Sequence, residues 1–155
     1  MPADFKFLKY GEAESPSGFC TFTDVEMFNR RHYEAAKVIN YDSKVLDLAC
    51  GQGIGIEYFS NKCAELVAAD AKIDNLRDVV IKGRSTSDLV SADANSLPFK
   101  DNYYDAVLIL EAVYYFPDIS KCIEESARVL KPNKGTLFFC LPNKEYYQWT
   151  DTRNK

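Results

Sequence analysis

Three aspartates and one glycine-rich segment carry the residue types of this sequence that are best suited to binding a polar ligand. The glycines lie in residues 47–55, which read DLACGQGIG. Asp47, Asp70 and Asp93 follow one another at intervals of 23 residues. Glycines let a chain turn sharply and let a ligand approach the backbone, and carboxylates accept hydrogen bonds from a ligand. If the fold brings these residues to one edge, they form a single site.

The elements that bring them together are predicted from short apolar runs that alternate with helical patterns, which is typical of βαβ units and a parallel sheet. We expect strands at 45–50, 66–69, 89–92, 106–110 and 136–141, and helices at 23–39, 53–61, 73–81 and 119–130. Asp118 is placed to cap the last helix, and Glu124 to pair with Arg128. The three aspartates then lie at the carboxyl ends of neighbouring strands, where ligands bind in open α/β sheets.

The charge of the aspartates indicates the kind of ligand. A carboxylate beside the glycine turn, Asp47, repels a pyrophosphate and attracts an ammonium group. Asp70 suits a ribose diol in a dinucleotide or an adenosyl compound, and Asp93 can accept from the exocyclic amine of adenine. The glycine spacing, G-x-G-x-G, also departs from the dinucleotide pattern G-x-G-x-x-G. These features favour S-adenosylmethionine over a nicotinamide dinucleotide.

Five ordered motifs point to the same ligand. They are VLDLACGQG at 45–53, AAD at 68–70, ADA at 92–94 with LPF at 97–99, YDAV at 104–107, and RVLKP at 128–132 with Gly135. Over residues 40–143 the chain resembles class I S-adenosylmethionine-dependent methyltransferases of the small-molecule type. The cofactor-binding residues that this resemblance implies are Asp47, Gly51 and Gly53 for the methionine part, Asp70 for the ribose, Asp93 and Ala94 for the adenine, and Ala49, Ala71 and Glu111 beside them.

The expected fold is a single α/β domain with a Rossmann-like, doubly wound parallel sheet of strand order 3-2-1-4-5 and an N-terminal cap helix. Residues 1–43 would form an irregular arm and the cap helix, 44–143 the cofactor-binding core, and 144–155 a tail. The sheet of the resembling family has seven strands, so we expect this sheet to lack the last two. The fifth strand would then be an exposed edge, which associates with a second copy or is covered by the tail through Tyr146, Tyr147 and Trp149.

Three residues are candidates for the general base that methyl transfer to a hydroxyl group would use: Glu111, His32 and Tyr115. Members of the resembling family often carry a histidine before the proline that follows the fourth strand. Residues 114–117 read YYFP, so that histidine is absent here. For Glu111, an exposed acid or one that merely orders its loop is an equally good interpretation.

Other candidates have structural alternatives of their own. Asp47 and Asp70 could cap loops through local hydrogen bonds, although the motif context favours ligand binding. His32 lies on the apolar face of its helix, where a buried, hydrogen-bonded histidine is the more common outcome. Arg30 and Arg31 could meet the carboxylate of the cofactor, but a polar helix face favours solvation.

Composition limits the partners. The net charge is −4, which disfavours binding to nucleic acid or to an anionic membrane. No apolar run reaches the roughly 20 residues that span a bilayer, so we expect a soluble, cytoplasmic protein. The five cysteines are irregularly spaced and no pair has metal-ligand spacing, so we expect free thiols and no metal.

The function predicted from the sequence is S-adenosylmethionine-dependent methyl transfer to an oxygen or nitrogen atom of a small-molecule acceptor, with a sugar-related compound as one candidate. The alternative is an S-adenosylmethionine-binding domain without catalysis of its own, acting as a partner subunit or as part of a longer enzyme.

Overall fold

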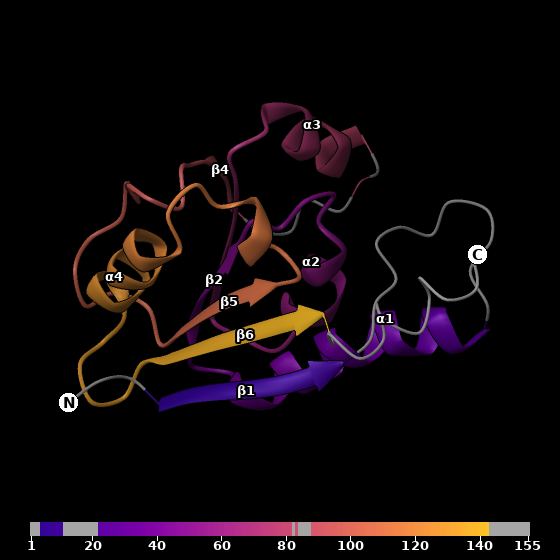
Figure 1. The fold of residues 1–155 in the computed structure, drawn as a ribbon, viewed down its shortest axis with the longest axis horizontal. Coiled ribbons are helices and arrows are strands. Elements are labelled where there is room, and N and C mark those ends of the chain that lie inside the picture. The colour runs from indigo at the N-terminus through magenta and orange to yellow at the C-terminus, as the bar shows by residue number, and fades with distance from the viewer. Residues whose placement is uncertain (1–3, 11–21, 82, 84–87, 143–155) are drawn as a thin grey trace, which may run out of the picture.

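The computed structural model describes residues 4–10, 22–81, 83 and 88–142, and these form one six-stranded sheet with helices on both faces (Figure 1). The strands are β1 (Asp4–Tyr10), β2 (Lys44–Leu48), β3 (Glu65–Asp70), β4 (Asp88–Ser91), β5 (Ala106–Leu110) and β6 (Thr136–Pro142). Every pairing is parallel, in the order β1-β6-β5-β2-β3-β4. The five predicted strands are all present, each within two residues of its expected ends, and their order of 3-2-1-4-5 is confirmed.

The central strands are buried on both faces, which explains why they read as continuous apolar runs. Leu46 and Val107 belong to a core cluster on one face of the sheet, whereas Val45 and Leu108 belong to a cluster on the other. Alternate side chains of a strand point to opposite faces, so each strand contributes to both clusters. Burying both faces fixes the sheet as the rigid base of the site.

The N-terminal residues differ from the prediction of an irregular arm. Asp4–Tyr10 form β1, which pairs with β6 from Asp4 opposite Thr136 to Tyr10 opposite Pro142. Figure 1 shows β1 alongside β6 at the side of the sheet that was expected to be open. The sequence DFKFLKY partly alternates between apolar and polar residues, and this strand signal was missed.

The prediction of an exposed fifth-strand edge is therefore wrong, and with it the reason for expecting a homo-oligomer through that edge. Parallel strands need hydrogen-bonding partners, and β1 supplies the backbone donors and acceptors that β6 requires. Tyr146, Tyr147 and Trp149, which were expected to cover the edge, lie outside the described residues.

The helices cover the two faces unequally. They are α1 (Phe22–Ala35), α2 (Ile54–Phe59), α3 (Ile73–Ile81) and α4 (Ile119–Val129), with short 3₁₀ turns η1 (Ala36–Val38) and η2 (Val113–Tyr115). α4 packs into one core cluster, and α1, α2 and α3 pack into the other. The predicted N-terminal helix thus ends as an α-helix at Ala35 and continues as a 3₁₀ turn.

The predicted start of α4 is confirmed, but one predicted ion pair is wrong. The Asp118 side chain accepts a hydrogen bond from the backbone N–H of Lys121 and so caps the helix. Arg128 pairs with Glu125 instead of Glu124, with Nη2 2.8 Å from the Glu125 Oε2. Arg128 also donates to the backbone carbonyls of Leu97 and Phe99 and pairs with Asp101, so its guanidinium ties α4 to the segment that precedes β5.

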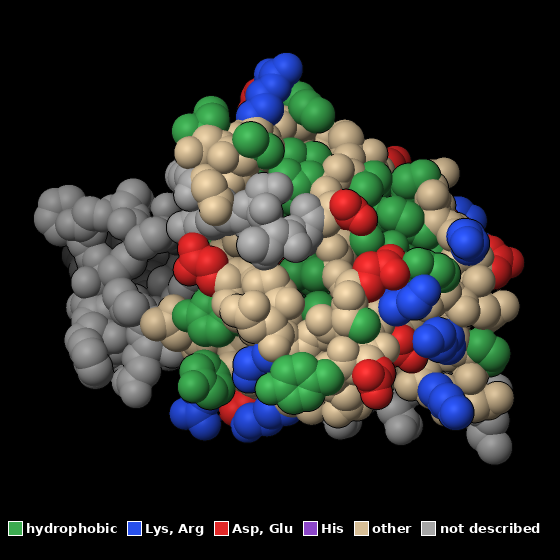
Figure 2. Space-filling view, turned by 180° about the vertical axis from the view of Figure 1, so that it is seen from behind, with side chains coloured by type: hydrophobic (Ala, Val, Ile, Leu, Met, Phe, Trp, Pro, Cys, Tyr) green, Lys and Arg blue, Asp and Glu red, His purple; other side chains and the backbone are tan. Residues whose placement is uncertain are grey.

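On the face shown in Figure 2, Lys and Arg side chains are interspersed with Asp and Glu side chains. Among the residues that the structure describes, no helix is long and apolar enough to cross a membrane.

Candidate functional site

A pocket of about 710 Å³ opens at the carboxyl edge of the sheet, where β2 and β5 lie side by side. Its wall comes from the segments that follow β2, β3, β4 and β5, and from α1. Ligands bind open α/β sheets where the strand order reverses, and that reversal lies between β2 and β5. The volume lies within the range usual for small-molecule sites.

The glycine-rich turn has free space beside Gly51 and is tightly packed at Gly53. Ala49, Gly51 and Gly53 all have positive φ, at 61°, 54° and 73°. A Cβ added at Gly51 would meet no atom within 4 Å, and Gly51 lines the pocket. A Cβ added at Gly53 would lie 2.6 Å from Cγ2 of Val79, and Gly53 is not among the lining residues. The structure therefore brings Gly51 to the pocket but uses Gly53 to pack the turn against α3.

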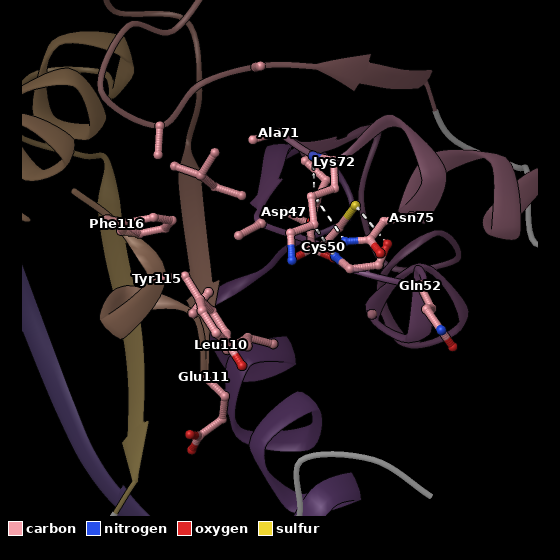
Figure 3. A pocket seen from close by; sticks show the side chains of 18 of the residues that line it. Asp47, Cys50, Gln52, Ala71, Lys72, Asn75, Leu110, Glu111, Tyr115 and Phe116 are labelled. Carbon is pink, nitrogen blue, oxygen red and sulfur yellow. Dashed lines mark hydrogen bonds between the residues drawn. The ribbon is translucent and has the colours of Figure 1, made fainter. Parts of the chain in front are cut away.

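Asp70 ties the turn to the end of β3. Its Oδ2 accepts from the backbone N–H of Gly51 at 2.9 Å. Its Oδ1 accepts from the backbone N–H of Lys72 at 2.8 Å and from Nδ2 of Asn75 at 3.0 Å (Figure 3). The residue is only 7% exposed. The local hydrogen bonds considered from the sequence are thus present, and the same carboxylate lines the pocket.

Asp47 is the most deeply buried carboxylate of the pocket, at 3% exposure. Burial and, to a smaller extent, the negative charge of Asp70 raise its pKa from 3.8 to about 7, although the positive charge of Arg31 opposes the shift. Its Oδ2 lies against the backbone of Gly55, where an added Cβ would approach to 2.5 Å. A cation that enters the pocket beside Asp47 would favour the charged form of this carboxylate and lower its pKa.

The remaining residues expected at the cofactor lie along the same edge. Ala71 and Asp93 are exposed at the rim of the pocket, and Ala94 is buried in its wall. The Asp93 carboxylate accepts from the backbone N–H of Asn95 at 2.9 Å. All of the cofactor residues expected from the sequence except Gly53 therefore line one pocket.

Glu111 follows β5 in a left-handed conformation, with φ of 55°, and it is 8% exposed. Its backbone N–H donates to the carbonyl of Cys140 at 3.0 Å, and the Cys140 thiol donates to its Oε1 at 3.4 Å. In Figure 3, Glu111 lies with Tyr115 on one side of the pocket, and Asp47 and Asn75 lie on the other. Glu111 is therefore a buried pocket residue and not an exposed loop acid.

The other two candidate bases also line the pocket but differ in exposure. His32 of α1 is 4% exposed, and its ring stacks on Tyr58 with centroids 4.9 Å apart. Tyr115 is 68% exposed, and its ring lies 4.5 Å from that of Tyr114. His32 thus combines the buried position expected for a structural histidine with a place in the pocket wall.

Several lining residues were missed or weighed differently in the sequence. Arg30 is exposed, as expected for a solvated helix face, whereas Arg31 is half-buried and lines the pocket. Lys72 and Asn75 lie at the start of α3, and their closeness to Asp70 in sequence was the available signal. Phe116 was noted only as part of a sequence that lacks a histidine, but it lies in the wall. In the described part of the chain, no group of three or more His, Cys, Asp or Glu side chains could hold a metal ion.

Comparison with known proteins agrees with this geometry. The model of a family described as "Methyltransferase domain" matches residues 46–139. A fatty-acid O-methyltransferase of Mycolicibacterium smegmatis is 29% identical over 143 residues, which are 87% of this chain and 52% of that protein. A demethylmenaquinone methyltransferase of Paenarthrobacter aurescens is 35% identical over 103 residues, which are 66% of this chain and 40% of that protein.

A crystal structure of a putative methyltransferase from Bacillus halodurans shares the fold, with a TM-score of 0.62 and 28% identity. The match covers 69% of this chain and 50% of that one. The chain thus spans about half the length of the relatives that it matches.

Proposed function

This chain belongs to the methyltransferase domain family, within the class I S-adenosylmethionine-dependent enzymes, and we propose that it binds S-adenosylmethionine in the pocket and transfers its methyl group to a small-molecule acceptor. The observation that carries the proposal is the meeting of two nearly buried aspartates and the open backbone of Gly51 in one pocket, at the reversal of strand order. Such a pocket fits a cation that carries hydrogen-bond donors better than it fits a phosphate.

The residues of the pocket divide between the parts of the cofactor. Asp70 would accept hydrogen bonds from the ribose diol, because each carboxylate oxygen can accept more than one bond. Asp47 would face the ammonium group, and the absence of a side chain at Gly51 leaves room for the methionine part. Asp93 and Ala94 would border the adenine at the rim. Each of the three aspartates of the pocket, Asp47, Asp70 and Asp93, is thus assigned to one part of the cofactor.

The chemistry depends on positioning. S-adenosylmethionine supplies an electrophilic methyl group, and its transfer is an in-line displacement in which acceptor atom, methyl carbon and sulfur are collinear. Glu111 would accept the proton that an acceptor hydroxyl or amine loses. His32, whose ring stacks on Tyr58, would hold α1 over the pocket and exclude water. An acceptor oxygen or nitrogen is therefore favoured.

The acceptor side of the pocket is aromatic. Tyr114 and Tyr115 are exposed at the pocket, and Phe116 lies beside them in the wall. Aromatic rings bind flat or apolar groups by stacking. The names of two relatives, which refer to a fatty acid and to demethylmenaquinone, also favour an apolar acceptor over a sugar-related one.

Calorimetry tests the cofactor part of this proposal. We expect S-adenosylmethionine and its demethylated product, S-adenosylhomocysteine, to bind the chain, and NAD not to compete, because the Asp47 carboxylate lines the pocket with the glycine turn and would repel a pyrophosphate. Absence of binding by both adenosyl compounds, or their displacement by millimolar NAD, would contradict the proposed function.

The second candidate is an S-adenosylmethionine-binding domain that needs further protein to catalyse transfer. The observation in its favour is that the chain spans about half the length of its relatives. Turnover separates the two: a panel of hydroxyl and amine acceptors is incubated with labelled S-adenosylmethionine and this chain. Product formation would support the enzyme, and cofactor binding without any product would support the binding domain.

A further inference from the structure

We propose that Glu111 makes this site select a neutral acceptor that donates a hydrogen bond, such as a phenol or an alcohol, and reject a carboxylate acceptor. This proposal rests on the proposed function and specifies its acceptor class.

The first support is that Glu111 is held rigidly at the pocket. Its left-handed backbone conformation is rare for a residue with a side chain, and the bond from its N–H to the Cys140 carbonyl stabilises that conformation. The Cys140 thiol donates to its carboxylate from the neighbouring strand β6. Burial raises the pKa of Cys140 to about 12, and the negative charge of Glu111 contributes to this increase. The carboxylate is thus positioned by two contacts from one residue.

The second support is the charge around Glu111. Asp47 and Asp70 are the other nearly buried carboxylates of the pocket, and Figure 3 shows Asp47 on the side opposite Glu111. Arg31 is a half-buried cation of the wall, and its positive charge lowers the pKa of both Asp47 and Cys140. Lys72 lies at the exposed rim beside Asp70. In the described part of the chain, Glu111 thus shares the pocket with two other nearly buried carboxylates, and an anion placed beside it is repelled where a neutral group is not.

The third support is the aromatic wall next to Glu111. Tyr115 lies on the same side of the pocket as Glu111 in Figure 3, and Tyr114 and Phe116 also line the pocket. A flat apolar body packed on these rings would place one polar substituent at Glu111. A hydroxyl or amine there donates to the carboxylate, whereas a second carboxylate there is repelled and leaves no proton to share.

Binding of a matched pair of probes tests this selection on the chain as it exists. Naphthol is neutral and naphthoate is anionic at pH 7, and the two have the same aromatic body. With the chain saturated by S-adenosylhomocysteine, which carries no net charge, we expect calorimetry to show naphthol binding at least about tenfold more tightly than naphthoate, since like charges in close contact cost several kcal/mol.

Variants identify the residue responsible. Glu111→Gln keeps a side chain of the same size that still accepts from Cys140, so we expect naphthoate to gain affinity and the preference to fall to about threefold or less. Cys140→Ala removes the thiol donor, and we expect a partial loss of preference with S-adenosylhomocysteine affinity unchanged. Glu124→Gln is the matched control, because Glu124 is exposed on α4 and does not line the pocket.

Each result has one meaning. Failure of S-adenosylhomocysteine to bind would contradict the proposed function. If it binds but naphthoate binds as tightly as naphthol, or neither probe binds, the selection by this chain is refuted. A preference that persists in Glu111→Gln would refute the assignment to Glu111.

Discussion

Asp70→Asn is the smallest change that separates the two roles of Asp70. The substitution keeps the size of the side chain but replaces one acceptor oxygen by an NH₂ group. The remaining oxygen can stay with the Lys72 N–H and the Asn75 side chain, which are two of the three donors. The NH₂ group then faces the N–H of Gly51, and the bond between the turn and β3 is lost.

The magnitude follows from that single lost contact. A hydrogen bond to a charged group contributes about 1.5 to 3 kcal/mol to stability. In a protein of this size 1 kcal/mol shifts the melting temperature by about 2 to 4 °C, so Asp70→Asn is expected to melt roughly 3 to 12 °C below the parent. Cofactor affinity falls by roughly 10- to 150-fold if the ribose diol loses a charged acceptor of the same strength.

Thermal unfolding followed by circular dichroism measures the first effect, and titration calorimetry with S-adenosylmethionine at a temperature well below both transitions measures the second. Asp93→Asn is the matched control for stability, because Asp93 is exposed and the hydrogen bond that its side chain accepts from the Asn95 N–H survives in the amide. An Asp70→Asn variant that melts with the parent would refute the structural role of this contact. Unchanged affinity would refute the ribose assignment.

Three further predictions concern pH and the glycine turn. Burial and a neighbouring carboxylate raise the pKa of Asp47 from 3.8 to about 7. The contribution of this shift to stability is therefore fully present below pH 3.8 and is lost as the pH rises through 7. Asp47→Asn should show a flatter dependence of the free energy of unfolding on pH between about 4 and 8. Hydrogen bonds from Arg128 lower the pKa of Glu125 from 4.5 to about 2, so Glu125→Gln should be less stable than the parent at pH 7. Acid titrations followed by fluorescence should show this difference in stability vanishing as the pH falls to about 2. Gly53→Ala should destabilise the fold by about 1 to 3 kcal/mol in denaturant titrations, because the added Cβ has no room. Gly51→Ala should be less destabilising in the same titrations but should weaken cofactor binding in calorimetry.

The strands and their order were predictable because they depend on local composition. Buried parallel strands read as apolar runs, and the crossovers between them leave few orders for five strands. β1 was not predicted because its stability comes from pairing with β6, more than 120 residues later, and local sequence gives little information about such a partner. The sequence of such a segment does not by itself distinguish a strand that pairs with a distant partner from an irregular arm.

The candidate site was predictable to the level of which residues meet, but not of what each contacts. The positions of Asp47, Asp70 and Glu111 follow from the strand ends, since parallel strands end at one edge. Arg30 and Arg31 are adjacent in sequence, and only the docking angle of α1 decides which of them enters the pocket. The two glycines of the turn look equivalent in sequence, and only the packing of α3 distinguishes them.

The contacts of Asp70 and Glu111 show how the pocket keeps its shape without a ligand. Asp70 accepts from the N–H of Gly51, and Glu111 accepts from the thiol of Cys140, so each carboxylate is oriented by a strand or turn other than its own. A ligand that binds to these carboxylates does not have to order them first, and the free energy of its contacts is retained as affinity. Weakening either orienting contact should therefore reduce affinity even where the carboxylate itself is unchanged, which is the reason that Cys140→Ala is expected to reduce acceptor selection.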